Sequence, residues 1–312
     1  MSTGVASRAP ARVLPAVAWV CGAGVVLAQI VYSMTAPGDR LPTTVLSVVL
    51  FCVASTLDAA SRCGWRTAGA LVAVAGGGGL VAEAVGVRTG FPFGDYDYTG
   101  TLGAEVLGVP VLVPMAWIMM AWPAVLVGRA LGRGWAVVPL AAWALASWDV
   151  FLDPQMVDAG HWAWAHPAPG LPGVDGIPLT NFAGWLLVAA LITGVLHAHL
   201  GPRTYRGTTD EAGAAGKTGG IGATGGTGKT GGIGKTGGSG RTGWMGKRGG
   251  AGGAGETDLR AGPAPVLYLW TYGSSVWAHA AFFGRPWVSV VAGLLMGLVA
   301  VPFAVALWRA HR

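Results

Sequence analysis

The sequence predicts an all-α protein, a polytopic transmembrane helix bundle of about eight helices, and three observations lead to this prediction. The first is composition: 53% of the 312 residues are apolar and 11% are charged, with a mean hydropathy of +0.54, whereas a soluble domain is about 25% charged. The second is a series of apolar stretches that approach or exceed the roughly 20 residues needed to span a bilayer. The third is the uneven placement of Lys and Arg. Together they indicate a multi-pass protein of the cell membrane.

Eight apolar stretches are expected to form the spanning helices. They cover residues 14–35, 41–61, 65–87, 108–127, 134–151, 182–200, 265–283 and 286–308, of which the fifth is the shortest. Arg8 and Arg12 precede the first stretch, as in a signal peptide. That stretch is longer than the usual hydrophobic region of about 7–15 residues. We therefore expect it to be a retained first helix.

The distribution of cations orients the bundle, because Lys and Arg gather on the cytoplasmic side of membrane proteins. With the N-terminus inside, all of the 20 Lys and Arg except Arg40, Arg88 and Arg285 fall on the inside. The bias recurs at nearly every loop, so both termini are expected in the cytoplasm. The net charge of +6 then reflects topology, and a nucleic-acid partner is not expected.

Composition divides the chain into three regions. Residues 1–205 are the expected membrane domain with six helices and the acid-rich outer loops, and residues 263–312 hold the last two helices. Residues 206–262 are rich in Gly, Lys and Thr, in an imperfect six-residue repeat such as GKTGGI. The fragment GGTGKTGG resembles a phosphate-binding loop, but such a loop needs a glycine five residues before its Gly-Lys pair, where Ala223 and Lys229 stand. We expect a disordered cytoplasmic linker with cations suited to contact anionic lipid.

Three acids fall within the expected spans, where a buried charge is costly and indicates function. Asp58 has Arg62 four residues later, a spacing that lets the two pair on one helix face, so Asp58 is expected to be structural. Glu83 follows four glycines at 76–79, which permit close helix contact or a kink. Two interpretations of Glu83 stay open: an interfacial carboxylate beside a packing device, and a functional acid.

The stretch WDVFLDPQMVDAGHWAW at 148–164 concentrates acids without a Lys or Arg. Asp149 and Asp153 are four residues apart, so on a helix that continues to Pro154 their Cβ atoms lie roughly 6 Å apart. Two carboxylates that close do not both ionise easily, and the carboxyl end of the helix dipole adds to this effect. One protonated acid beside one ionised base is the arrangement of general acid–base catalysis. The alternative is that both residues cap the helix exit into water.

Two outer loops interleave aromatic residues with polar ones: FPFGDYDY at 91–98 and HWAWAH at 161–166. Their aromatic residues include Tyr96, Tyr98, Trp162 and Trp164. Aromatic residues at this depth form an interfacial belt or line a pocket that stabilises a cationic intermediate. Both interpretations stay open.

Four stretches of the core resemble one family. They are TGFPFGDYDYTGTLG (89–103), GVP (108–110), WDVFLDPQMVDAGHWAW (148–164) and GIPLTNFAGW (176–185). They run in one order from about the third span through the sixth. At these residues the chain resembles the integral-membrane carotenoid biosynthesis proteins, which include carotenoid 1,2-hydratases of the bisanhydrobacterioruberin hydratase type. The long Gly/Lys/Thr linker departs from the compact pattern of that family, on the side opposite to the acids.

The resemblance implies an enzyme that adds water to the terminal double bond of an acyclic carotenoid end, without a cofactor. Such a reaction needs a proton donor, a site that tolerates a tertiary carbocation, and a base that activates water. We expect Asp149 as the acid and Asp153 as the base, with Glu83 as the alternative acid and Asn181 or Tyr96 orienting the water. The residues expected to bind the substrate are Tyr96, Tyr98, Trp148, Trp162, Trp164, Asn181 and Trp185. The expected partners are the lipophilic carotenoid, membrane lipid and other membrane enzymes of the carotenoid pathway.

Two other functions stay open. The Asp149–Asp153 spacing is similar to the magnesium-binding motifs of prenyl (lycopene-elongating) transferases, which need two acid-rich motifs and cations for the diphosphate. This chain has one acid cluster and few cations on its outer face. The other function is a non-enzymatic carotenoid-binding or transport protein, although no clear inverted repeat is found. No bound metal is expected, because His161 and His166 lack the helical spacing of a ligand pair.

Overall fold

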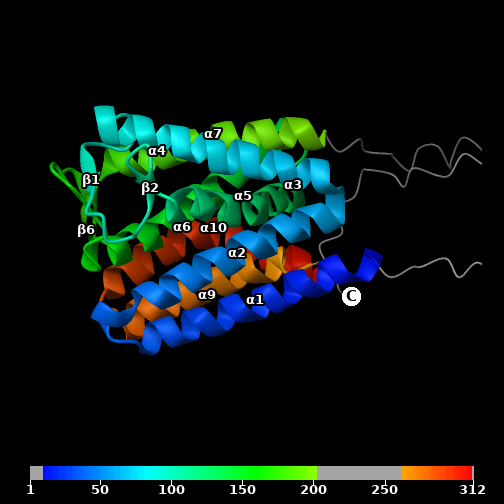
Figure 1. Ribbon diagram of the computed structural model, residues 1–312, viewed down its shortest axis with the longest axis horizontal. Coiled ribbons are helices and arrows are strands. Elements are labelled where there is room, and N and C mark those ends of the chain that lie inside the picture. Colours follow the sequence, from blue (N-terminus) through cyan, green and yellow to red (C-terminus); the bar gives the residue numbers. More distant parts are fainter. Residues whose placement is uncertain (1–9, 202–261, 311–312) are drawn as a thin grey trace, which may run out of the picture. The chain divides into compact units, whose positions relative to one another are not determined.

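The computed structural model describes residues 10–201 and 262–310, which form a single helical unit (Figure 1). The expected linker at 206–262 lies outside the described residues except for Gly262. The expected helix bundle is confirmed. Its helices are α1 (Pro10–Met34), α2 (Leu41–Cys63), α3 (Trp65–Leu71), the π-helical η2 (Val72–Gly77), α4 (Gly78–Thr89), α5 (Leu112–Leu131), α6 (Val137–Asp158), α7 (Leu179–Leu200), α9 (Ala264–Ala281) and α10 (Pro286–Ala310), with 3-10 turns η1 (Pro37–Asp39) and η3 (Gly134–Ala136).

Seven helical segments of the described part are long and apolar enough to cross a membrane, with α3, η2 and α4 forming one of them. The expected span at 265–283 is the helix α9, which is not among the seven. Polar residues such as Thr271, Ser274, Ser275 and His279 lower its mean hydropathy. It nevertheless packs along α10 and contacts α5.

Two of the differences between the expected and the observed helix bounds affect the site. The fifth extends to Asp158, through Pro154, so that Asp149 and Asp153 lie on the same helix α6. The fourth begins at Leu112, four residues later than expected, because Val109–Pro110 forms strand β3. The condition for the two aspartates to share a helix face is therefore met.

The glycines before Glu83 bring the helical segment formed by α3, η2 and α4 close to α5. A Cβ atom on Gly79 would lie 2.5 Å from Cγ of Trp117, and one on Gly76 would lie 2.7 Å from Cδ1 of Ile118. At Gly79, which faces the rigid ring of Trp117, only glycine allows this approach, so close helix contact is the role of this position. The π-helical turn at Val72–Gly77 is a local irregularity of the kind that often accompanies functional sites.

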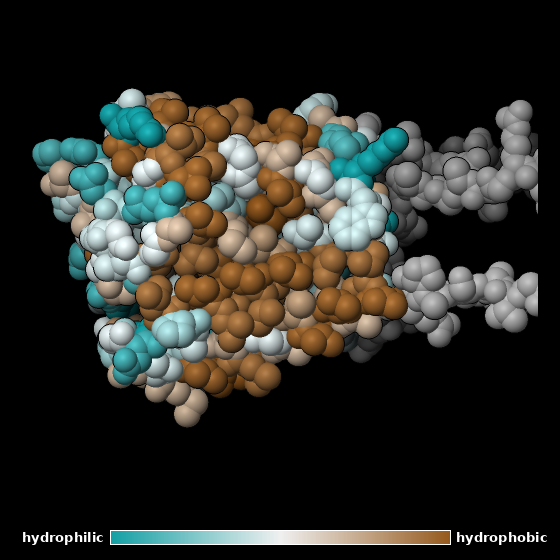
Figure 2. All heavy atoms as spheres, in the orientation of Figure 1, coloured by the Kyte–Doolittle hydropathy of each residue, from teal (hydrophilic) through white to brown (hydrophobic). Residues whose placement is uncertain are grey.

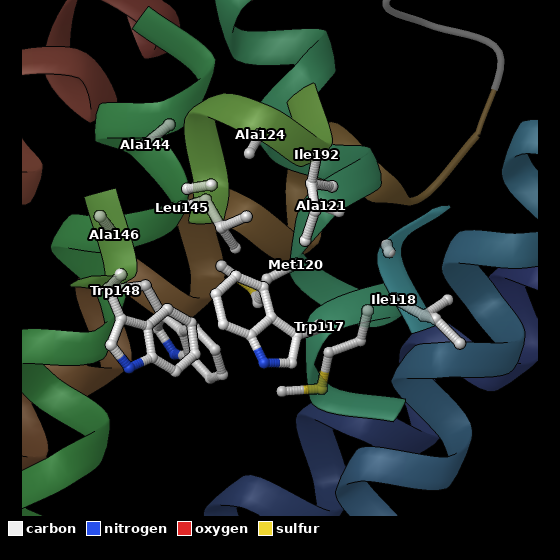
Figure 3. Packing of buried hydrophobic residues seen from close by; sticks show 14 of the residues in the cluster. Trp117, Ile118, Met120, Ala121, Ala124, Ala144, Leu145, Ala146, Trp148 and Ile192 are labelled. Atoms are coloured by element: carbon white, nitrogen blue, oxygen red, sulfur yellow. The ribbon is translucent and has the colours of Figure 1, made fainter. Parts of the chain in front are cut away.

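The core of the bundle surrounds α5, whose residues from Trp117 to Arg129 are buried. Figure 3 shows alanines of α5 and α6 beside the large rings of Trp117 and Trp148. Small residues let the helices approach closely, and both tryptophans are buried in the same core. Near the C-terminal end of α2, the carboxylate of Asp58 accepts a hydrogen bond from Nε of Arg62 over 2.6 Å and another from Nε1 of Trp122 over 2.7 Å. The expected structural pairing of Asp58 is confirmed.

Short strand pairs gather at one end of the bundle (Figure 1). The pairs are β1 (Tyr96–Tyr98) with β4 (Trp162–Trp164), β2 (Glu105–Val106) with β3 (Val109–Pro110), and β5 (Gly170–Leu171) with β6 (Val174–Pro178). These strands were not expected from the sequence. Buried and exposed residues alternate in β1 and β4, the period-2 pattern that indicates a half-buried strand, whereas β2 is exposed and β3 is buried throughout.

The surface supports a membrane location, because an apolar belt covers the middle of the bundle and hydrophilic residues lie toward its ends (Figure 2). Large apolar side chains in the middle of long helices, such as Val20 of α1 and Leu294 and Leu298 of α10, are exposed. The end with the strands also holds the loops of Arg40, Arg88 and Arg285. This is the segregation of charge that the sequence predicts; that the opposite end faces the cytoplasm stays a prediction.

Candidate functional site

Two aromatic segments far apart in sequence form one wall of the site. Strands β1 and β4 pair antiparallel, with Tyr96 opposite Trp164 and Tyr98 opposite Trp162. Alternate side chains of a strand point to opposite faces, so Asp97 and Ala163 are exposed between the buried rings. Tyr96 packs on Trp164 and Tyr98 on Trp162, each pair with ring centroids 5.8 Å apart. Four rings therefore turn toward the helices.

Two buried aspartates of α6 meet an asparagine of α7 beneath this wall. Asp149 and Asp153 are 0% and 2% exposed. Nδ2 of Asn181 donates to Oδ2 of Asp149 over 3.0 Å and also to Oδ2 of Asp153. Trp162 donates from Nε1 to Oδ1 of Asp153 over 3.2 Å. In the part of the chain that the structure describes, neither aspartate forms an ion pair.

Glu83 lies in a different environment, with three donors around one carboxylate. Its Oε2 accepts from the hydroxyl groups of Tyr96 and Tyr98, the latter over 2.9 Å, and its Oε1 accepts from Nε1 of Trp117 over 3.1 Å. An ionised carboxylate is an acceptor for several such bonds. Hydrogen bonds of this kind offset the cost of burying its charge. Glu83 therefore ties α4 to the strand wall and to α5.

The two tyrosines of β1 are held as neutral donors. Burial raises the pKa of both Tyr96 and Tyr98 above its usual value, and the nearby charge of Glu83 raises it further. Both hydroxyl groups therefore keep their protons across the physiological pH range. Next to the β1–β4 strand pair, the Thr101 hydroxyl lies 2.7 Å from Nδ1 of His161, and burial lowers the pKa of this histidine.

A cavity lies between the acids and the inner faces of α2, α5 and α6. A water-sized sphere can occupy about 80 Å³ of it, well above the roughly 10–15 Å³ that one water requires. Glu83, Asp153, Asn181 and the strand aromatics line its polar end. The rest of its wall is mostly apolar and includes Val48, Leu102, Leu112, Val113, Ala116, Met119, Leu152 and Met156, with Thr44 near the start of α2.

All residues that line this cavity lie within residues 43–215, and this segment, more than half of the chain, matches the family of carotenoid biosynthesis proteins. The chain belongs to this family. Over 112 residues it is 34% identical to bisanhydrobacterioruberin hydratase of Haloarcula japonica, a match that covers 34% of this chain and 36% of that relative. The chain thus matches about a third of the length of that relative. No solved structure matches this carotenoid biosynthesis protein.

The structure brings most of the expected site residues together in this carotenoid biosynthesis protein. Those that line the cavity are Glu83, Tyr96, Tyr98, Asp153, Trp162, Trp164, Asn181 and Trp185. Asp149 is fully buried behind Asp153 and is not part of the cavity wall. Trp148 also lies outside that wall and packs edge-on against Trp185, with centroids 6.1 Å apart.

Sequence reasoning missed two aromatic residues of the site. Trp117 stacks on Trp185 with centroids 4.0 Å apart and donates to Glu83, while Phe93 lines the cavity. Trp117 lies in an apolar span where a tryptophan usually fills core space, so nothing local distinguished it. Phe93 belongs to the aromatic run at 91–98 but precedes strand β1. Strand alternation would have grouped it with the exposed Asp95 and Asp97, so the local pattern gave no signal for its burial. Among the described residues, no group of His, Cys, Asp and Glu is arranged to hold a metal ion.

Proposed function

We propose that this protein is a membrane enzyme that adds water across the terminal double bond of an acyclic carotenoid end by acid–base catalysis. The observation that carries the proposal is the buried Asp149–Asp153 pair, joined by Asn181, of which Asp153 lines the polar end of an otherwise apolar cavity. The carotenoid biosynthesis family supports the substrate class. The partial similarity to a named hydratase supports the reaction.

The hydrogen-bond donors around the three acids indicate which of them can carry the proton for the first step of hydration. Glu83 has three donors that stabilise its ionised form, whereas the aspartate pair has the side-chain donors of Asn181 and Trp162 for four oxygens. Two buried carboxyl groups so close together are stabilised by a shared proton. The pair therefore acts as the proton donor, and Asp153 presents that proton to the cavity because it lines the wall.

In the proposed reaction, the aspartate pair first gives up a proton and finally takes one back. Asp153 gives a proton to the less substituted carbon of the terminal double bond, whose π electrons form the new C–H bond. The positive charge falls on the tertiary carbon. A water oxygen donates an electron pair to that carbon and forms the C–O bond. The surplus proton of the water returns to the aspartate pair, so that one water molecule is consumed and no cofactor is needed.

The aromatic wall supports the charged stage of this sequence. The rings of Tyr96, Trp162 and Trp164 line the cavity beside Asp153, and an aromatic face stabilises a desolvated cation by about 0.5–2 kcal/mol. Asn181, which already donates to both acids, orients the entering water in this scheme. The division expected from sequence, with Asp149 as acid and Asp153 as base, is untested, and the proposed scheme departs from it by taking the first proton from Asp153. The cavity wall favours Asp153 as the residue that contacts the substrate.

The apolar walls suit a polyene. Residues of α2 and α5, such as Val48, Leu112 and Ala116, line the same cavity as Asp153. A carotenoid end held there would leave its conjugated chain in a hydrocarbon environment. A diphosphate substrate finds no matching charge, because no Lys or Arg is among the described residues that line the cavity. The site chemistry thus favours hydration over the magnesium-dependent prenyl transfer.

The test is expression of the full chain in cells that accumulate an acyclic carotenoid, followed by mass analysis of the pigment. The expected product has gained one water per reacted end, and isolated membranes form it equally with and without a magnesium chelator. A product extended by an isoprenoid unit, formed only with magnesium and a prenyl diphosphate, would identify a transferase. Carotenoid that copurifies with the protein and stays unchanged would identify a binding protein.

A further inference from the structure

A second cavity lies beside the first, between α1, α2, α6 and α9. Nine of the sixteen described residues that line it have polar side chains, although apolar atoms make up the larger part of its surface. A water-sized sphere can occupy about 120 Å³ of it, several times the roughly 10–15 Å³ that one water requires. Helices α1 and α9 lie outside the segment that matches the family. This cavity is therefore a separate feature of the bundle.

Helix α9 turns a polar stripe toward the cavity. Thr271, Ser274 and Ser275 have the spacing that places side chains on one helix face, and all three line the cavity. Gln29 of α1 and Gln155 of α6 also line it. Polar side chains inside a membrane bundle pair with one another or line a water-filled space. The low hydropathy of α9 is thus concentrated on the face that meets this cavity.

The Thr271 hydroxyl indicates what fills the space. Thr271 is 4% exposed, lines the cavity, and its Oγ1 has no hydrogen-bond partner among the described residues. A buried hydroxyl without a partner destabilises a fold, and an internal water commonly supplies the missing bond. A polyene carries no donor or acceptor and would leave this hydroxyl unpaired.

A thin partition separates this cavity from the acid site. Thr44, Val48, Met119, Leu152 and Met156 line both cavities. Methionine side chains are unbranched and flexible, so a rotation of Met119 or Met156 can connect the two spaces.

One charged side chain, that of Arg40, packs against the wall of the polar cavity at the end nearest the strands. The guanidinium group of Arg40 lies 5.1 Å from the ring centroid of Tyr32 and 5.0 Å from that of Phe283, and both rings line the cavity. Arg40 is half-buried at the start of α2, at the end of the bundle that holds the strands. A cation therefore lies next to two rings of the cavity wall, at the end of the bundle that holds the strands.

We propose that this polar cavity holds water and supplies the molecule that is added at the acid site, with Thr271 as a positioning residue for that water. The inference rests on the proposed hydration. It separates the two reactants: the carotenoid occupies the apolar cavity, and water arrives through the partition at Met119 and Met156.

The experiment measures how the carbocation divides between two fates. In heavy water the acid transfers a deuteron, and the cation either captures water or loses a proton and returns as deuterium-labelled, unhydrated carotenoid. Membranes with matched protein levels are incubated with an acyclic carotenoid, and the ratio of labelled unhydrated to hydrated pigment is measured. The variants are Thr271→Val, which removes the hydroxyl, Thr271→Ser, which keeps it, and Ser275→Leu, which fills the cavity. The control is Thr193→Val, because Thr193 is buried on α7 and lines neither cavity.

Thr271→Val is expected to raise this ratio about fivefold, the effect of one ordinary hydrogen bond, and Ser275→Leu is expected to raise it further. Thr271→Ser and Thr193→Val should keep the wild-type ratio. Equal ratios in Thr271→Val, Ser275→Leu and Thr193→Val, with hydration by the wild type intact, would overturn the water cavity alone. An unchanged ratio in Ser275→Leu together with less copurified carotenoid would show that the cavity holds pigment, which also overturns it. If the wild type forms no hydrated pigment, the proposed function fails and this inference fails with it.

Discussion

Asn181 donates a hydrogen bond from Nδ2 to Oδ2 of Asp149 over 3.0 Å, and the same amide also hydrogen-bonds Asp153. One side chain at the start of α7 therefore fixes the relative position of two acids on α6. Replacing Asn181 by Leu, of similar size, should lower the free energy of unfolding by about 1–3 kcal/mol, because buried carboxyl oxygens lose their donor. Thermal unfolding in detergent measures this, and an unchanged midpoint would argue against a structural role for the amide.

The aspartate pair carries the chemistry in the proposed mechanism. Asp153→Asn and Asp149→Asn should each lower the hydrated product by roughly 10²-fold or more, the usual contribution of general acid catalysis. The matched control is Asp158→Asn on the same helix, because Asp158 is half-exposed and pairs with Arg285, and it should matter much less. Pigment composition at equal protein levels is the measurement. Near-normal conversion by both variants would move the acid role to Glu83.

Glu83 is expected to act mainly as an anchor for the strand wall. In Glu83→Gln an amide N–H₂ replaces one oxygen and meets donors from Tyr96, Tyr98 or Trp117, so the free energy of unfolding should fall by about 1–3 kcal/mol. Folded protein of this variant should keep part of its hydration activity. The control is Glu105→Gln on the exposed strand β2, which should leave stability unchanged. A loss of roughly 10²-fold in product without a loss of stability would instead make Glu83 the acid.

The close approach of α4 to α5 at Gly79 offers a test of packing. Gly79→Ala places a Cβ atom 2.5 Å from the Trp117 ring, and such overpacking costs about 1–3 kcal/mol. Gly77→Ala, two residues earlier, meets nothing within 4 Å and should be neutral or stabilise the protein by up to about 1 kcal/mol. Thermal unfolding of the two variants compares them directly. Equal midpoints would contradict the tight contact.

The orientation in the membrane is testable by reporter fusions. A reporter joined within residues 203–260 should be cytoplasmic, and one joined within residues 153–180 should lie outside, because the excess of Lys and Arg faces the cytoplasm. Accessibility of the two reporters to a membrane-impermeant reagent is the measurement. The reverse labelling would place the acid site and the strands on the cytoplasmic side.

Features encoded within a few neighbouring residues were predictable from the sequence. Apolar length identified the spanning helices, and the four-residue spacing of Asp149 and Asp153 placed them on one helix face. The run of glycines before Glu83 indicated the close helix contact. Each of these depends on helical geometry alone, which repeats every few residues.

Contacts between distant segments emerged only when the helices were packed together. The pairing of Tyr96 with Trp164, the bridge from Asn181 to the aspartates, and the bond from Trp117 to Glu83 each join different elements. Packing also puts Asp153 in the cavity wall and Asp149 behind it, although the two share a helix. No local pattern specifies such choices, because which face of a helix meets a cavity depends on every neighbour that covers the other faces.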